Sequence, residues 1–254
     1  MSFRLTLHPS FEHLRTVMAK IPAMMQGEEG VVLQDGRNLV KKFEIEPGFW
    51  INVKRYHKPK GLNKLIYSLY LRKPKGRRAY LYPDCLAKIG IYSPESIAYI
   101  EERKMGIIGY TYFVSLQLDY EHRCYEFTEL VPGKDDPLID AFATFAARLH
   151  KGRMMHRDFS PGNILWTYRD GKYLFALIDT NQMRFGYVGK RLGCANFARL
   201  YGHKPFFRRL ATTYANQRNF PVDDCIALVL RYRRRFWTRY ARRKPEKVVF
   251  ELDL

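Results

Sequence analysis

The chain has 254 residues, and its 44 lysines and arginines against 25 acidic residues give a formal charge of +19, which suits a polyanionic partner such as a nucleotide, a phosphorylated glycan, nucleic acid or an anionic membrane. Hydrophobic residues make up 46% of the chain and aromatic residues 15%, enough to bury a sizeable core, which excludes disorder for most of it. The longest apolar runs fall far short of the roughly 20 residues that span a bilayer, and the first residues lack the apolar segment of a signal peptide, so we expect a cytoplasmic protein.

Residues 1–30 are interpreted as an N-terminal extension, with a short helix over residues 11–20 that Ser10 caps. After this extension the pattern changes to short strands, and the step Asp35-Gly36 favours a hairpin turn between the first two. Strands are expected at residues 31–33, 39–43, 49–55, 97–100 and 109–118. We therefore predict a β-rich N-terminal lobe over residues 31–118, interrupted by a basic, aromatic insertion at residues 54–88.

Helical spacing dominates the remainder, residues 119–254, beginning with a helix around Phe142 to Leu149. Two strands at residues 164–168 and 173–178 follow, joined by a turn at Asp170-Gly171. The last long helix is expected to bury Cys225, Val229, Tyr232, Phe236 and Tyr240 and to expose arginines on another face. These patterns predict an α+β fold with a helical C-terminal lobe.

The most informative motif is HRDxxxxN, formed by His156, Arg157, Asp158 and Asn163, with Asp179 sixteen residues further on. It lies on a loop after a helix, a β-hairpin follows, and the second aspartate ends that hairpin. This is the catalytic-loop arrangement of the protein-kinase-like fold. In phosphoryl transfer the first aspartate orients the attacking hydroxyl, while the asparagine and the second aspartate hold Mg²⁺. We therefore assign catalysis to Asp158 and the metal to Asn163 and Asp179.

Nucleotide binding is assigned to three residues of the N-terminal lobe. Lys54 ends an Ile-Asn-Val-Lys strand that matches the lysine strand of kinases in position and context, and Asn52 shares its face. No GxGxxG loop precedes it. Arg37, in the turn that occupies the place of that loop, would have to contact the ATP phosphates instead, although an ordinary hairpin turn explains this segment equally well.

Four segments together resemble the bacterial lipopolysaccharide core kinases, the Kdo and heptose kinase family: HRDFSPGNIL, IDTNQMRFG, the NVK strand and GIYSPESIAYIE. The resemblance covers roughly residues 28–235. It implies a bilobal protein-kinase-like fold with a β-rich N-lobe and a helical C-lobe. It also implies ATP- and Mg²⁺-dependent phosphorylation of a sugar hydroxyl in the lipopolysaccharide inner core, at the cytoplasmic face of the inner membrane.

Several departures from the kinase pattern motivate an alternative, a catalytically weak pseudokinase or binding scaffold of the same fold. The helix glutamate that pairs with the lysine aligns with Leu81, and Pro83 disfavours a helix interior, so this helix is expected to begin only at Pro83. Asp84 is then a replacement partner for Lys54. Ser160 stands where protein kinases usually carry a lysine. A kinase for cationic small molecules is a further alternative that the basic composition disfavours.

The C-terminal helix carries eight lysines and arginines between Arg231 and Lys244 and no acid. One interpretation is contact with an anionic membrane surface, which would make the protein peripheral on the inner membrane. The other is a helix that packs on the core and exposes a solvated basic face. Nucleic acid is the least favoured partner, because the aromatic residues fit buried spacing better than an exposed stacking platform.

Overall fold

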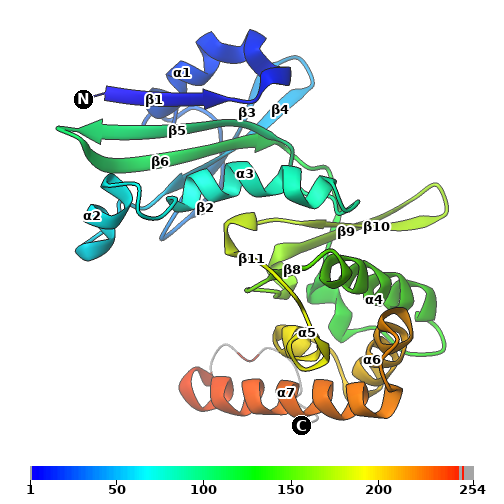
Figure 1. Ribbon diagram of the computed structural model, residues 1–254. Helices are drawn as coiled ribbons and strands as arrows, with labels where there is room; N and C mark the ends of the chain where they lie inside the picture. Colours follow the sequence, from blue (N-terminus) through cyan, green and yellow to red (C-terminus); the bar gives the residue numbers. More distant parts are fainter. Residues whose placement is uncertain (1, 246–247, 249–254) are drawn as a thin grey trace. The chain divides into compact units, whose positions relative to one another are not determined.

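The computed structural model describes residues 2–245 and 248, which form two compact units. The first comprises Met1–Cys85 and Pro94–Asp119, and the second comprises Leu86–Ser93 and Tyr120–Leu254. Figure 1 shows that a broad sheet makes up most of the first unit, whereas the second is largely helical. The α+β class predicted from the sequence is confirmed.

The first unit contains a six-stranded antiparallel sheet in the order β1-β5-β6-β4-β3-β2. Its strands are β1 (Ser2–Leu7), β2 (Val31–Asp35), β3 (Leu39–Glu46), β4 (Phe49–Tyr56), β5 (Ser96–Lys104) and β6 (Ile107–Leu116). Strand β1 is not among the expected strands, although Phe3, Leu5 and Leu7 alternate with polar residues as a half-buried strand does. It pairs with β5, so the N-terminal residues belong to the sheet.

Helices cover both faces of this sheet. On one face, the turn η1 (Pro9–Leu14) and helix α1 (Arg15–Met24) bury Met18 and Ile21 against Ile51 and Val53 of β4. Helix α1 begins at Arg15, four residues later than the sequence predicts, and no side chain caps it. His8 instead caps η1, where its Nδ1 accepts a hydrogen bond from the backbone N–H of Ser10. The other face holds a smaller cluster formed with helix α3 (Lys75–Ala87).

Helix α3 corrects the expectation that Pro83 begins a helix, because α3 starts at Lys75 and contains Pro83 in its interior. The proline costs a backbone hydrogen bond. Next to that gap, Ser96 Oγ donates to the carbonyl of Tyr80 at 2.7 Å, and Ala79 and Tyr80 pack on Tyr99 of β5. These contacts with the sheet outweigh the local preference. A shorter helix, α2 (Leu62–Ser68), lies between β4 and α3.

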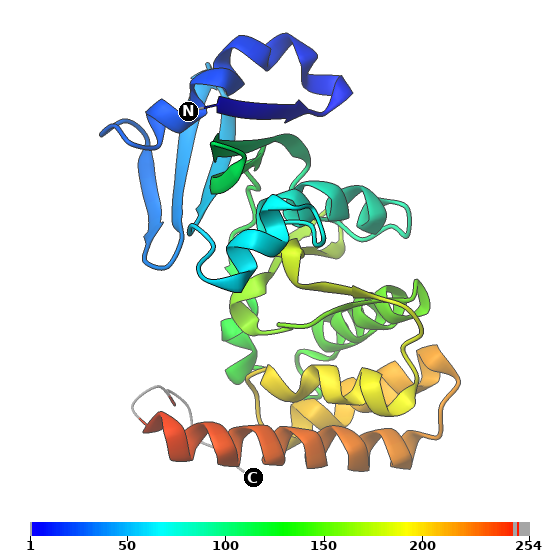
Figure 2. The same ribbon diagram turned by 60° about the vertical axis from the view of Figure 1, so that its left-hand side comes forward.

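The described part of the second unit contains four α-helices: α4 (Asp136–Lys151), α5 (Lys190–Asn196), α6 (Lys204–Arg218) and α7 (Val222–Arg243). Its strands are β7 (His122–Arg123), β8 (Met154–His156), β9 (Ile164–Arg169), β10 (Lys172–Leu177) and β11 (Met183–Phe185). Short 3₁₀ turns are η2 (Cys124–Thr128), η3 (Pro161–Asn163), η4 (Thr180–Gln182) and η5 (Phe197–Arg199). Figure 2 shows α7 running beside α5 and α6, which it also contacts.

The buried stripe of α7 differs from the expected one. It consists of Cys225, Val229, Arg233 and Trp237, while the predicted aromatics flank it half-buried. Arg233 is only 1% exposed, and its guanidinium donates to the carbonyl of Gly202 at 2.7 Å. Arg233 thus lies on the buried face of α7 rather than on its exposed face. In the described part of the chain, no helix has the length and apolar character needed to cross a membrane.

Candidate active site

The loop between β8 and β9 carries Asp158 and Asn163, and Asp179 follows β10. Strands β9 and β10 pair so that Ile164 faces Leu177, and the backbone N–H of Ile178 donates to the carbonyl of Asn163 at 3.0 Å. Asn163 and Asp179 therefore lie at the same end of this hairpin. The predicted hairpin and its left-handed turn at Asp170-Gly171 are both present.

His156 connects the two aspartates of the motif. Its imidazole is fully buried; Nε2 lies 3.1 Å from the carbonyl oxygen of Asp179, and Nδ1 accepts from the backbone N–H of Asp158 at 3.2 Å. Burial lowers the pKa of His156, so the ring is neutral with its proton on Nε2. The motif histidine thereby fixes the backbone of both aspartates through one side chain.

Asn163 and Asp179 present oxygen atoms suited to a hard cation. Asn163 Nδ2 donates to the carbonyl of Asp158 at 2.9 Å, which fixes the amide and leaves Oδ1 as its acceptor atom. Asp179 has a left-handed backbone, with φ of 55°, and its Oδ1 accepts from the side chain of Asn181. Among the described residues no group of three or more His, Cys, Asp or Glu is placed to hold a metal. Mg²⁺ commonly binds through one or two protein oxygens plus phosphates and water, so the two residues fit it.

Packing against aromatic side chains of the second unit holds the loop between β8 and β9 in place. Phe159, next to Asp158, is fully buried and stacks on Phe142 of α4, with 5.9 Å between ring centroids. Gly162 allows the close approach of Tyr125, because a Cβ at this position would lie 2.5 Å from the Tyr125 hydroxyl oxygen. The loop is therefore a packed element of the second unit.

Arg199 belongs to the candidate site, and the sequence does not reveal it. Its Nη1 donates to Asp158 Oδ1 at 2.5 Å, and its guanidinium also lies over the ring of Phe236 in α7, 5.4 Å from the centroid. Both partners of the ion pair are partly exposed, 46% for Arg199 and 36% for Asp158, so the pair contributes little to stability. It does place a cation beside Asp158, where Ser160 replaces the usual lysine.

A buried chain of hydrogen bonds extends from α4 to the catalytic loop. His150 Nε2 lies 3.0 Å from Asn196 Oδ1, and Asn196 Nδ2 donates to the carbonyl of His156 at 2.9 Å. On its other side, His150 Nδ1 lies 2.9 Å from the hydroxyl of Tyr214, which accepts from Arg218. Because Asn196 uses its NH₂ group toward His156, its oxygen must accept from His150, which fixes the His150 proton on Nε2.

Burial lowers the pKa of His150 to about 4; the hydrogen bond to Asn196 opposes this shift, and the positive charge of Arg218 adds a smaller lowering. The imidazole is therefore neutral at pH 7, as its acceptor role toward Tyr214 requires. Gly193 makes room for this chain, because a Cβ there would overlap the Tyr214 hydroxyl at 2.0 Å.

The three residues assigned to the nucleotide belong to the first unit. Lys54 lies on β4 between β3 and β6, with its ammonium 5.3 Å from the ring centroid of Tyr56. Asn52 Nδ2 donates to Gln117 Oε1 at 2.9 Å, so its amide is engaged within the unit. Arg37, in the β2–β3 turn, is exposed and lines a cavity of about 260 Å³. Their contacts with a nucleotide stay a prediction.

Asp84 is exposed on α3, one turn beyond Tyr80. Burial and the nearby Asp84 charge both raise the pKa of the Tyr80 phenol. The pairing of Asp84 with Lys54 stays a prediction.

A scan against known protein families matches residues 51–229 to the Lipopolysaccharide kinase (Kdo/WaaP) family, which is more than half of the chain. The chain belongs to this family. The resemblance seen in the sequence motifs is thereby confirmed, and this lipopolysaccharide kinase is a phosphotransferase. A search of curated proteins finds no match to it.

Solved structures agree on the fold of this lipopolysaccharide kinase. It matches "WaaP in complex with acyl carrier protein" with a TM-score of 0.58 and 17% identity, covering 97% of this chain and 99% of that one. It also matches the ADP-bound aminoglycoside phosphotransferase APH(2'')-Ib with a TM-score of 0.52 and 11% identity, covering 94% and 92%. The predicted bilobal protein-kinase-like fold is confirmed.

Proposed function

We propose that this lipopolysaccharide kinase uses ATP to phosphorylate a sugar hydroxyl of the lipopolysaccharide inner core. The observation that carries the proposal is the catalytic loop, in which the buried His156 bonds to the backbone of both Asp158 and Asp179. Such rigid placement suits phosphoryl transfer, where catalysis is mainly positioning and charge stabilisation. ADP- and ATP-bound aminoglycoside phosphotransferases among the structural neighbours support nucleotide use.

In the proposed reaction, Asp158 orients the acceptor hydroxyl and accepts its proton. The hydroxyl oxygen forms a bond to the γ-phosphorus, the bond between that phosphorus and the bridging oxygen breaks, and ADP leaves. Lys54, Asn52 and Arg37 bind the nucleotide. Arg199, which pairs with Asp158, supplies positive charge near the transferred group.

Asn163 and Asp179 would hold Mg²⁺ through Asn163 Oδ1 and the Asp179 carboxylate. When bound, the ion neutralises charge on the phosphate oxygens. The protein's own contribution is orientation: the carbonyl oxygen of Asp158 fixes the amide of Asn163, and Asn181 restrains the carboxylate of Asp179.

The test is incubation of the purified protein with labelled ATP, Mg²⁺ and lipopolysaccharide core acceptors. We expect transfer by the wild type and its loss in Asp158→Ala and in Asp179→Ala, the latter also weakening Mg²⁺-dependent nucleotide binding. Asp170→Asn is the matched control, because it removes an exposed carboxylate from the hairpin turn while asparagine tolerates the left-handed backbone there. A folded wild type that binds nucleotide but phosphorylates none of the acceptors would favour the scaffold alternative.

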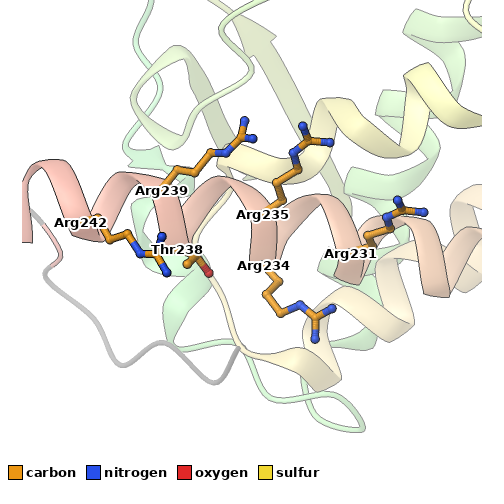
Figure 3. A pocket seen from close by; sticks show the side chains of 6 residues that line it. All are labelled: Arg231, Arg234, Arg235, Thr238, Arg239 and Arg242. Carbon is orange, nitrogen blue, oxygen red and sulfur yellow. The ribbon is translucent and has the colours of Figure 1, made fainter.

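We also propose that the protein associates with the anionic cytoplasmic leaflet of the inner membrane. Exposed arginines of α7 line a hollow of about 360 Å³ together with Thr238 (Figure 3): Arg231, Arg234, Arg235, Arg239 and Arg242. Their side chains project from α7 on two sides in Figure 3. Basic residues near such a leaflet contribute on the order of 1 kcal/mol each, and salt weakens the attraction.

Co-sedimentation with vesicles tests this association. We expect more binding to anionic than to neutral vesicles, and less binding after α7 is neutralised by Arg235→Gln, Arg239→Gln and Arg242→Gln. A control of equal charge change uses exposed lysines elsewhere in the same unit: Lys134→Gln, Lys151→Gln and Lys172→Gln. Binding that is unaffected by lipid charge or by the arginine changes would leave α7 as a solvated basic helix.

A further inference from the structure

Helix α2 and the segment after it expose a group of leucines that no described part of the first unit covers. The exposed fractions are 72% for Leu62, 55% for Leu65, 57% for Leu69 and 75% for Leu71. The first three are spaced i, i+3 and i+7 and share one face of the helix. Exposed apolar groups of this kind mark contact sites on proteins. We call these four residues the leucine face.

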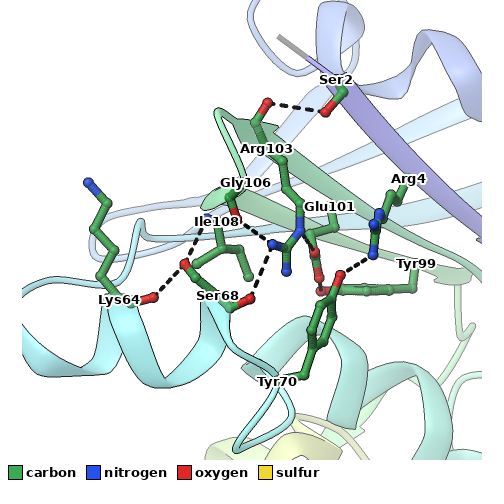
Figure 4. Close-up of polar contacts among 10 residues, drawn as sticks. All are labelled: Ser2, Arg4, Lys64, Ser68, Tyr70, Tyr99, Glu101, Arg103, Gly106 and Ile108. Carbon is green, nitrogen blue, oxygen red and sulfur yellow. Dashed lines mark hydrogen bonds and ion pairs between the residues drawn. The ribbon is translucent and has the colours of Figure 1, made fainter.

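The leucine face is held on the sheet by buried polar contacts at the end of α2 (Figure 4). The Arg103 guanidinium of β5 donates to the carbonyl oxygens of Ser68 at 3.3 Å and Gly106 at 2.5 Å, and pairs with the buried carboxylate of Glu101. Ser68 Oγ accepts from the backbone N–H of Ile108 at 3.0 Å. The β5–β6 turn is therefore tied to α2, and its Met105 adds an apolar side chain that is 93% exposed.

The turn that ends α2 is shaped to expose Leu71. The N–H of Leu71 bonds to the carbonyl of Ile66 at 3.0 Å, while Tyr70 has φ of 57°, a left-handed conformation that favours glycine. The Tyr70 side chain is held by a hydrogen bond from Arg4 and by the Arg103 guanidinium over its ring. In such turns an apolar residue at this position usually packs back onto the helix. Here it projects outward.

Positive charge surrounds the leucine face. Residues 57–83 contain eight lysines and arginines and no aspartate or glutamate. On the opposite side of α2, Asn63 and Tyr67 line the 260 Å³ cavity, together with the cationic residues Arg37, Lys58, Lys60 and Lys75. All charged residues of this segment are basic, so an aliphatic surface within it is complementary to a bilayer with anionic headgroups.

We propose that the leucine face inserts into the acyl boundary of an anionic bilayer while the surrounding lysines contact the headgroups. The exposed groups are aliphatic, as insertion among acyl chains requires, whereas binding of a nucleic acid strand would use aromatic stacking. This inference rests on the proposed membrane association and identifies an apolar contact for it in the first unit, separate from the arginines of α7.

The experiment measures binding of the full chain to phosphatidylcholine vesicles with and without phosphatidylglycerol. Leu69→Ser combined with Leu71→Ser should lower the apparent affinity for anionic vesicles about tenfold or more, because two leucine side chains then no longer enter the acyl region. Val131→Ser is the matched control, since Val131 is 56% exposed in the second unit. Because these residues are exposed, the thermal unfolding of both variants should match the wild type.

Insertion itself is measured by tryptophan fluorescence in Leu71→Trp, where lipids brominated in their acyl chains should quench the new indole, whereas Val131→Trp should show no such quenching. Unchanged affinity of the double serine variant, together with no added quenching in Leu71→Trp, would overturn the inference even if the wild type binds vesicles. A wild type that binds no anionic vesicle would overturn the membrane association as well, while leaving the kinase assay unaffected. A dimer in light scattering that becomes monomeric in the double variant would assign the leucine face to a second copy of the chain instead.

Discussion

Acidification should weaken this fold in part through protonation of His150. The folded state lowers the pKa of His150 to about 4, from 6.5 as an ordinary value. Because the unfolded chain binds this proton more tightly, the folded protein loses stability as the pH falls from above 6.5, and the loss levels off below pH 4. At pH 5 the protonation of His150 alone should lower the free energy of unfolding by about 2 kcal/mol relative to pH 8, since each pKa unit corresponds to about 1.4 kcal/mol.

The assay is urea unfolding at pH 8 and pH 5 of the wild type and of His150→Gln. Glutamine can still donate toward Asn196, but with poorer geometry, so the substitution should lower the free energy of unfolding by about 1–2 kcal/mol at pH 8. Because glutamine does not titrate, the variant should lose about 2 kcal/mol less of this free energy between pH 8 and pH 5 than the wild type. His156, whose pKa is also lowered by burial, titrates in both proteins and cancels in this comparison. Equal losses in the two proteins would refute the reasoning.

Three further predictions concern other side chains. Arg199→Gln should lower turnover about a hundredfold, with little change in thermal unfolding because its ion pair is partly exposed; normal turnover would show that Arg199 has no catalytic importance. Asp84→Asn should lower activity at subsaturating ATP if its carboxylate orients Lys54, and full activity would remove Asp84 from that role. Asp140→Ala should lower the free energy of unfolding by about 1–2 kcal/mol at pH 7 in urea titrations, since Asp140 accepts from Arg209 and Thr213. The bond to Arg209 holds the Asp140 pKa below its ordinary 3.8, so this difference should persist above that pH and disappear as the pH falls through the lowered pKa; a difference unchanged in strong acid would contradict the argument.

The sequence predicts the hairpin of the candidate site because its determinants are local. The turn at Asp170-Gly171 and the spacing from Asp158 to Asn163 lie within a few residues of the structure that they specify. Arg199 could not be found in this way. It lies 41 residues beyond Asp158 in a segment with no motif, and only tertiary packing brings its guanidinium to the carboxylate.

Elsewhere, tertiary contacts override a local rule. Pro83 predicts a helix boundary, yet the packing of Ala79 and Tyr80 on the sheet keeps α3 continuous through it. Arg233 appears in the sequence as one of many arginines on a basic helix, but it is buried and bonded to a backbone carbonyl. Charge pattern alone does not distinguish an arginine that packs inside from those that face solvent.

The pairing of β1 with β5 sets an order on folding during synthesis. Ser2 faces Arg103 in the completed sheet, so the first strand to leave the ribosome finds its partner 101 residues later. At the usual rate of translation this delay is on the order of 5–20 s. During that time the apolar side chains of α1 have only part of their sheet to pack on. The sheet of the first unit is therefore completed late. A fragment limited to residues 51–229, the span matched to the family, would lack three of the six strands.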